Sequence, residues 1–194
     1  MAPDIYPEHY QMVQDLGAAL AAEPLTQNML YVGNALRQNQ HNGARDKLHF
    51  FDASYMENWK SANGNQAQSE AYTVTIQLAR EALAAGRIIM LNSGPWGGDA
   101  TTEQEMMDGL PNNLAIFLMM AEENAYLHYA KYPLITTPTW HWDTSHFPLL
   151  NQALGPPLGP PILIGTVMSR DFQYLSVQMD LEAEISSFQW VTPP

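Results

Sequence analysis

The chain has 194 residues, enough for one domain with a sizeable core. Its 20 acidic and 8 basic residues give a formal charge of −12, which would repel a phosphate backbone, so nucleic acid is not an expected partner. The chain has no cysteine, which excludes disulfides, thiolate zinc sites and a cysteine nucleophile. Hydrophobic residues make up 46% and charged residues 14%, a globular composition.

The first residues, "MAPDIYPEHY", contain neither the basic region nor the apolar stretch of a secretory signal. The longest apolar run, "LAIFLMMA", is too short to cross a bilayer. We therefore expect no membrane span. The compartment stays open, and it would be extracellular if the chain is excised from a secreted precursor.

In the first part of the chain, helical patterns alternate with short apolar runs, which indicates an α/β fold. A 3.6-residue apolar period predicts a helix over residues 7–22. A second helix is expected over residues 69–86, with Ser69 as N-cap and Gly86 at its end. Apolar runs predict strands over residues 29–36, 47–58 and 87–93.

A Gly-rich loop after the third strand leads into a long apolar helix expected over residues 112–130. Residues 133–142 predict a fourth, weaker strand, which Pro133 and Pro138 restrict to an edge. The stretch "LGPPLGPP", residues 154–161, is expected to be a rigid extended connector without regular pairing.

The end of the chain alternates polar and apolar residues at period 2, which predicts a β-hairpin or small sheet. One face of it should carry Val177, Met179 and Leu181. The whole chain is then one α/β domain: βα repeats over residues 1–154, followed by the Pro-rich connector and the hairpin over residues 155–194.

Four strands alternating with helices are about half of a closed (β/α)₈ barrel. The predicted architecture is therefore a partial, half TIM barrel. Such a half-barrel leaves two open sheet edges and an apolar face exposed. We expect a homodimer, or a partner chain that completes the barrel.

Five segments occur in a characteristic order: "FFDASYMENW", "GRIIMLNSGPWGG", "LAIFLMMAEENAYLHYA", "LGPPLGPP" and "SRDFQYLSVQMD". Together they resemble the C-terminal half of glycoside-hydrolase-like TIM barrels. The positions that carry the resemblance are Asp52, Glu57, Phe117, Leu118, Tyr126, Leu158, Gly159, Arg170 and Phe172.

The resemblance implies that Glu57 is presented at the barrel mouth and that Phe117, Leu118 and Tyr126 lie on a later helix. The sequence departs from it at Ala53, where many relatives have Gly, and at "NS" after the third strand, where a basic residue is expected.

Glycoside hydrolysis normally uses two carboxylates, one as acid and one as nucleophile or base. Glu57 is the first catalytic candidate, because an apolar run ends just before it; a solvated loop carboxylate is the alternative. Asp52 would face the other side of a regular strand. The second carboxylate could be Asp99, which also fits a helix N-cap, or Asp143.

Aromatic rings pack on the apolar faces of sugars, and nearby amides bind the hydroxyls. The candidate substrate-binding residues are Trp59, Trp96, Trp140, Trp142, Tyr31, Asn34 and Asn92. The alternative for the aromatic residues among them is that several fill a core or a subunit interface.

His141, Asp143 and His146 could bind a metal, but their spacing matches no established motif, and an ordinary polar loop is the expectation. "NSGPWGG" lacks the lysine of a phosphate-binding loop. We therefore expect no metal and no cofactor.

Three functions follow from this pattern. The first is a glycoside-hydrolase-like protein that acts on O-glycosyl bonds or binds a carbohydrate, with Glu57 as acid/base candidate. The second is a non-catalytic structural or assembly subunit that keeps the barrel scaffold. The third is a carbohydrate-binding module without hydrolysis.

Overall fold

The computed structural model describes residues 6–24, 26, 29–33, 50–56, 66–94, 102–129 and 148–191. Helices and strands alternate in the first part of the chain, and strands alone fill the last part. The described elements are α1 (Tyr6–Ala22), β1 (Val32–Gly33), β2 (Ala53–Met56), α3 (Gln68–Ala84), β3 (Ile88–Ser93), α4 (Glu103–Met120), β4 (Ala125–Tyr129), the 3-10 helix η3 (Pro148–Asn151), β5 (Ile162–Ile164), β6 (Val167–Phe172), β7 (Leu175–Asp180) and β8 (Ile185–Trp190).

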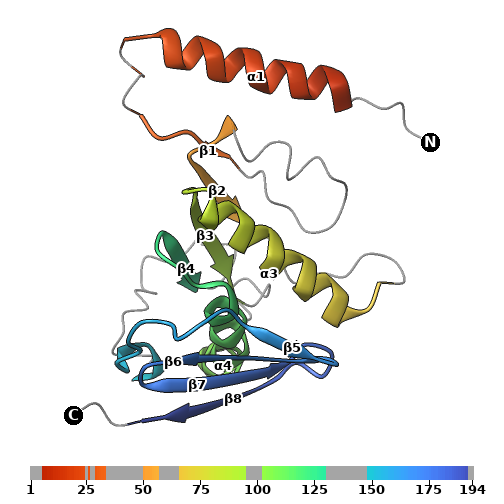
Figure 1. The fold of residues 1–194 in the computed structure, drawn as a ribbon, viewed down its shortest axis with the longest axis vertical. Coiled ribbons are helices and arrows are strands. Elements are labelled where there is room, and N and C mark those ends of the chain that lie inside the picture. The colour runs from red at the N-terminus through yellow and green to blue at the C-terminus, as the bar shows by residue number, and fades with distance from the viewer. Residues whose placement is uncertain are drawn as a thin grey trace.

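Strands β1 to β4 form a parallel sheet whose spatial order follows the chain, β1-β2-β3-β4 (Figure 1). Helix α3 connects β2 to β3, and α4 connects β3 to β4. Because helices alternate with parallel strands, the α/β expectation is confirmed. Within the described strands the order never reverses, so this sheet lacks the switch point of a doubly wound fold.

Strands β5 to β8 form a second, antiparallel sheet in the order β5-β6-β7-β8. The expected alternation is present, because Val177, Met179 and Leu181 are all completely buried. Their polar neighbours Gln178 and Asp180 point to the other face. The C-terminal region is thus a four-stranded sheet, the larger of the two predicted outcomes.

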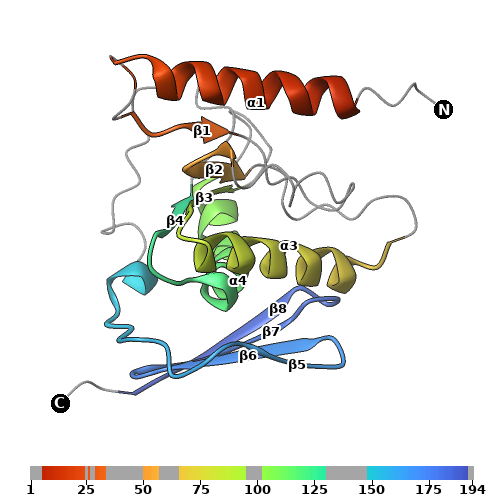
Figure 2. The same cartoon turned by 45° about the horizontal axis from the view of Figure 1, so that its top comes forward.

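Helix α4 lies between the two sheets (Figures 1 and 2). It contacts β4 on one side and β6, β7 and β8 on the other. Met119 and Met120 on α4 belong to the same buried cluster as Leu91 of β3 and Val177 of β7. One continuous core therefore joins the parallel sheet, its helices and the C-terminal sheet.

The long helix expected over residues 112–130 has different bounds. It begins nine residues earlier, because Thr102 is its N-cap and forms a reciprocal capping box with Glu105. The helix includes Pro111 and ends at Met120. The next residues turn through Asn124, which has a positive φ of 70°, and enter β4. The expectation that Tyr126 lies on a helix was therefore wrong.

Arg170 supplies a physical reason for this ending. Its buried Nη1 donates to the carbonyl oxygens of Leu118 at 2.8 Å and Ala121 at 2.6 Å, at the end of α4. The last carbonyls of a helix lack partners within it, and here a side chain from β6 provides them. A partner so distant in sequence leaves no local signal.

The Arg170 guanidinium also joins three segments. Its Nε donates to the Gly159 carbonyl at 3.1 Å, and its Nη2 donates to Glu122 Oε1 at 2.6 Å. Arg80 of α3 donates to the same Glu122 oxygen at 2.7 Å. Burial lowers the pKa of the Arg170 guanidinium, and the Glu122 carboxylate opposes that effect. These contacts of Arg170 with Leu118, Ala121, Glu122 and Gly159, which we call the hub, fix the C-terminal sheet to the end of α4.

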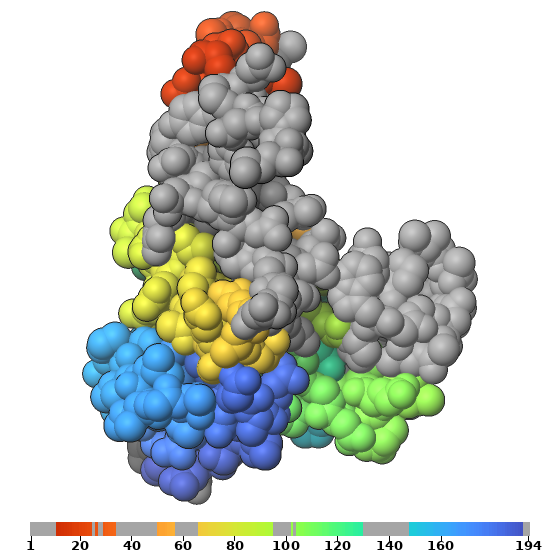
Figure 3. Space-filling view, turned by 90° about the vertical axis from the view of Figure 1, so that its right-hand side faces the viewer, coloured from red at the N-terminus to blue at the C-terminus, as the bar shows by residue number. Residues whose placement is uncertain are grey.

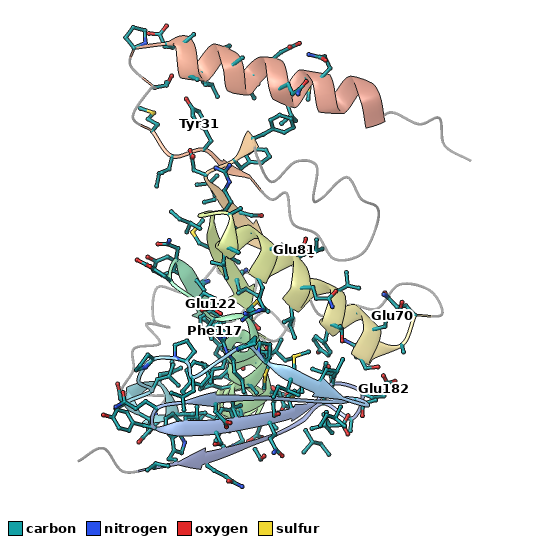
Figure 4. The ribbon with its side chains drawn as sticks, in the orientation of Figure 1. Tyr31, Glu70, Glu81, Phe117, Glu122 and Glu182 are labelled. Atoms are coloured by element: carbon teal, nitrogen blue, oxygen red, sulfur yellow. The ribbon has the colours of Figure 1, made fainter. Side chains whose placement is uncertain are left out.

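Helix α3 begins differently from the expectation. Its N-cap is Ala67, which provides no side-chain hydrogen bond, so the assignment of Ser69 was wrong. Instead, the Ser69 N–H donates to Glu182 Oε2 at 2.9 Å. Glu182 lies in the turn between β7 and β8. Figure 4 shows Glu182 beside the first turn of α3, near Glu70. A distant carboxylate therefore caps this helix and interacts favourably with its dipole.

The end of α3 is as expected. Gly86 has a φ of 77° and its N–H donates to the Leu83 carbonyl, while the Arg87 N–H donates to that of Ala82. These two bonds make a Schellman motif, which needs a left-handed residue after the helix. Glycine adopts that conformation without the penalty of a Cβ.

The Pro-rich segment does more than connect, contrary to the expectation of no regular pairing. The Leu158 N–H donates to the Asp171 carbonyl at 2.9 Å, and the Pro156 carbonyl accepts from the Gln173 N–H at 3.0 Å. Pro157 forms an isolated antiparallel bridge with Phe172. The segment is therefore attached to the end of β6 as well as to Arg170.

Helix α1 begins within one residue of its predicted start, but residues 11–22 of this helix contain no buried residue. In Figure 3 it lies at one end of the molecule, with the C-terminal sheet at the other. Of the described helices, none combines the length and apolarity needed to cross a membrane. The strand expected over residues 133–142 lies outside the described residues.

Candidate functional site

The parallel sheet has two different faces. On one face, Ser93 of β3 donates to Asn113 Oδ1, and the Tyr129 hydroxyl of β4 donates to the Met106 carbonyl at 2.8 Å; both acceptors lie on α4. Side chains alternate along a strand, so the residues before these two point away from the helices. Those residues are Asn92 and His128, on what we call the helix-free face.

Asn92 and His128 are direct partners in the register of β3 and β4. His128 Nδ1 lies 2.8 Å from Asn92 Oδ1. An amide oxygen can only accept, so this contact requires the hydrogen to be on Nδ1. The other ring nitrogen, Nε2, is not part of this contact and lies on an exposed side chain.

The pair sits at the carboxyl end of the sheet. Asn92 and His128 are the next-to-last residues of β3 and β4. Two residues earlier, Met90 and Tyr126 are also register partners and therefore share the helix-free face. Tyr126 is 57% exposed, so an aromatic side chain is accessible on the same face, two residues before His128.

The opposite face is closed. Tyr129 is buried, and burial raises the pKa of its phenol. Gly109 of α4 approaches so closely that a Cβ there would lie 2.8 Å from the Tyr129 hydroxyl oxygen. The Tyr129 phenol therefore remains protonated and buried, holding the end of β4 against α4, while its neighbour His128 faces outward.

Of the predicted substrate-binding residues, the structure describes Asn92 and Tyr31. Tyr31 lies at the amino end of the sheet, just before β1, and its hydroxyl donates to the Thr26 carbonyl at 3.2 Å. Figure 4 shows it between α1 and β1. Val32, the residue after Tyr31, is level with Ala53 of β2 and Ile88 of β3 in the register of the sheet. Asn92 lies four residues further along β3, a distance of about 13 Å. The structure does not bring Tyr31 and Asn92 together.

Asp52 also lies at the amino end. Its Oδ2 accepts from the Tyr31 N–H at 2.9 Å, and its Oδ1 lies 3.8 Å from Arg87 Nη1. The carboxylate thus joins the start of β1 to the start of β2. Asp52 therefore lies at the amino end of the sheet, away from its carboxyl end.

All eight remaining predicted site residues lie outside the described residues. Nothing in the structure tests their roles, and the same holds for His141 and His146. They are Asn34, Glu57, Trp59, Trp96, Asp99, Trp140, Trp142 and Asp143.

Sequence reasoning missed His128. The stretch "AYLHY" was assigned to the helix before it, and a histidine there had no assigned partner. The signal was present, because Ala125, Leu127 and Tyr129 alternate with Tyr126 and His128 at period 2. The preceding "EENA" contains an Asn suited to the left-handed turn.

Within the described ranges, no group of three histidine, aspartate or glutamate side chains is arranged to hold a metal ion. His128, Asn92 and Tyr126 instead present an imidazole, an amide and a phenol on the helix-free face. These three groups can donate and accept hydrogen bonds, and the phenol ring can stack on another ring.

The model of the family described as hypothetical glycosyl hydrolase family 15 matches residues 4–176. The match covers α1, the whole parallel sheet and the C-terminal sheet as far as the start of β7. No curated protein matches the chain.

Proposed function

The chain belongs to hypothetical glycosyl hydrolase family 15, and from this premise we propose that it binds a carbohydrate and hydrolyses an O-glycosyl bond. The observation that carries this proposal is the Asn92–His128 pair. It places hydrogen-bonding groups on the helix-free face, at the carboxyl end of parallel strands. That end is where ligands bind in parallel α/β folds, because the loops after the strands meet there.

Glu57 is the proposed acid/base residue. It follows Met56, the last residue of β2, and Met56 pairs with Leu91, the residue before Asn92. Asp99 and Asp143 are the candidates for the second carboxylate. Asp99 follows β3 in a segment that contains Trp96, and Asp143 follows β4 in a segment that contains Trp140 and Trp142; Trp is a residue type that stacks on sugars.

We further propose that the parallel sheet is half of a barrel. Its strands are all parallel and follow chain order, as in a (β/α)₈ barrel. At its β1 side, Met29, Leu30 and Val32 are more than half exposed. A homodimer or a partner chain that completes the barrel would cover them. Sedimentation of the purified chain as a stable monomer at all concentrations would oppose this.

The hydrolysis proposal is tested with the purified protein and an array of α- and β-linked gluco-, galacto-, manno- and xylo-oligosaccharides. Products are followed by chromatography, and the anomer formed first is identified by NMR. Glu57→Gln should lower any hydrolytic activity at least about 100-fold, roughly the contribution of general acid–base catalysis. Glu123→Gln is the matched control, since Glu123 is exposed in the turn before β4. Equal loss in both variants, or none in Glu57→Gln, removes Glu57 from the mechanism.

A non-catalytic assembly subunit is the second candidate. The observation that favours it is the exposed apolar surface of α1, where Met12 and Leu16 lie one helical turn apart and are both more than half exposed. Stable self-association without hydrolysis of any oligosaccharide in the array would support this function. A carbohydrate-binding module would instead bind oligosaccharides and release no product.

A further inference from the structure

We propose that His128 is a substrate-binding residue whose Nε2 hydrogen-bonds a sugar hydroxyl, and that Asn92 is the positioning residue that fixes its imidazole. This inference rests on the proposed carbohydrate ligand and names a direct contact for it.

The first support is orientation. Asn92 and His128 are held at the same level by the backbone pairing of β3 and β4, so their side chains meet without help from a loop. On the other face of the sheet, the next residues, Ser93 and Tyr129, are anchored to α4 by hydrogen bonds. The direction of His128 is therefore determined by buried contacts one residue away.

The second support is chemistry. His128 Nδ1 forms a hydrogen bond with Asn92 Oδ1 at 2.8 Å. The second ring nitrogen, Nε2, lies on the other side of the imidazole and is not part of this bond. An imidazole held in one orientation presents Nε2 at a defined position, and a sugar hydroxyl can hydrogen-bond it there. A histidine that served only to stabilise the sheet would gain little from an exposed side chain, since exposed polar pairs contribute little to stability.

The third support is the surrounding surface. Tyr126 lies two residues before His128 on the same face and is 57% exposed. The backbone of Tyr126 lies about 7 Å from that of His128 along the strand, the repeat of two residues. The pair therefore offers a polar contact above an aromatic surface, a combination that fits the hydroxyl edge and apolar face of a pyranose.

The test measures binding of the same oligosaccharide array by calorimetry and, where turnover occurs, KM and kcat. His128→Ala should weaken binding roughly tenfold and raise KM more than it lowers kcat, the effect of losing one ground-state hydrogen bond. His128→Gln should recover part of the loss, because its amide can still hydrogen-bond. Gln178→Ala, on the exposed outer face of β7, is the control and should bind like the parent.

Asn92 is tested by a spectroscopic readout that a purely structural role would not change. In the parent protein, the 15N shifts of the His128 ring should identify one dominant tautomer with hydrogen on Nδ1. Asn92→Ala should mix the tautomers and weaken binding to an intermediate degree. Unfolding curves of all variants establish that each remains folded.

The outcomes separate this inference from the proposed hydrolysis. Binding that depends on His128 without product release supports the inference and removes the hydrolase. Hydrolysis with unchanged KM in His128→Ala supports the hydrolase and overturns the inference. A parent protein that binds none of the oligosaccharides at millimolar concentration also overturns it, as does a ring with hydrogen mainly on Nε2.

Discussion

The two ends of this molecule differ in how they are held. In the C-terminal sheet, Leu175, Val177 and Met179 are almost completely buried against α4. In α1, residues 11–22 contain none that is buried, and Leu16 is 56% exposed. Apolar burial is the main driving force of folding. Most of the apolar burial in the described residues therefore lies around α3, α4 and the C-terminal sheet, while α1 leaves Met12 and Leu16 exposed.

The largest expected effect is at the hub. Arg170→Met removes a buried guanidinium and leaves the carbonyls of Leu118 and Ala121, as well as Glu122, without this donor. Breaking a buried pair from one side costs about 3–5 kcal/mol of unfolding free energy. Urea unfolding measures it. Arg80→Met, which removes the more exposed partner of Glu122, should cost no more than about 1 kcal/mol. Similar costs for both would contradict the hub.

A pair of leucine truncations tests the comparison directly. Leu175→Ala should lower the unfolding free energy by about 2–5 kcal/mol, because it leaves a cavity in the core. Leu16→Ala should change it by less than about 0.5 kcal/mol, as is typical of surface positions. Both are measured by urea unfolding of the isolated chain. An equally large loss in Leu16→Ala would show that α1 is covered in solution.

Replacing each of two helical glycines by alanine should have a smaller effect on stability, and the two substitutions should change it in opposite directions. An alanine normally stabilises a helix by about 1 kcal/mol over glycine. At Gly17 of α1 nothing lies within 4 Å of the new Cβ, so Gly17→Ala should raise the helix content of α1, seen by circular dichroism. At Gly109 the Cβ would lie 2.8 Å from the Tyr129 hydroxyl, and overpacking costs about 1–3 kcal/mol. A stabilised Gly109→Ala variant would be the unexpected result.

The smallest effect is the pH dependence of the contact between α3 and the C-terminal sheet. The Ser69 hydroxyl and N–H hold the pKa of Glu182 below its usual range, and the N–H groups of Ala183 and Glu182 do the same for Asp180. Depressed folded-state pKa values stabilise the fold above the unfolded values, about 4, and this contribution is lost as pH falls through the folded values.

Glu182→Gln should therefore lower stability at neutral pH and flatten its decline in acid. The urea midpoint as a function of pH measures this decline. Glu123→Gln is the matched control and should keep the parent profile. An unchanged profile in Glu182→Gln would separate this carboxylate from the cap of α3.

Local patterns predicted several elements well. The start of α1, the strand "IIMLNS", the glycine that ends α3 and the buried face of the C-terminal sheet were all read correctly. Each is determined by nearby residues. Gly86 is sufficient for its turn, and Val177, Met179 and Leu181 show their face by spacing alone.

The errors came from partners distant in sequence. The end of α4 depends on Arg170, some fifty residues later, and the cap of α3 depends on Glu182, more than a hundred residues later. The misplaced end of α4 concealed β4, and with it the Asn92–His128 pair. A candidate site assembled from two strands was thus lost through one helix boundary.

The sequence by itself determined the composition class, the alternation of helices and strands and the alternating C-terminal strands, because periodic burial is written into neighbouring residues. Only the tertiary structure decided where α4 ends, what caps α3 and which side chains meet on the helix-free face. Those features depend on hydrogen bonds between elements far apart in the chain. Such pairs become neighbours only after packing, and no local pattern encodes them.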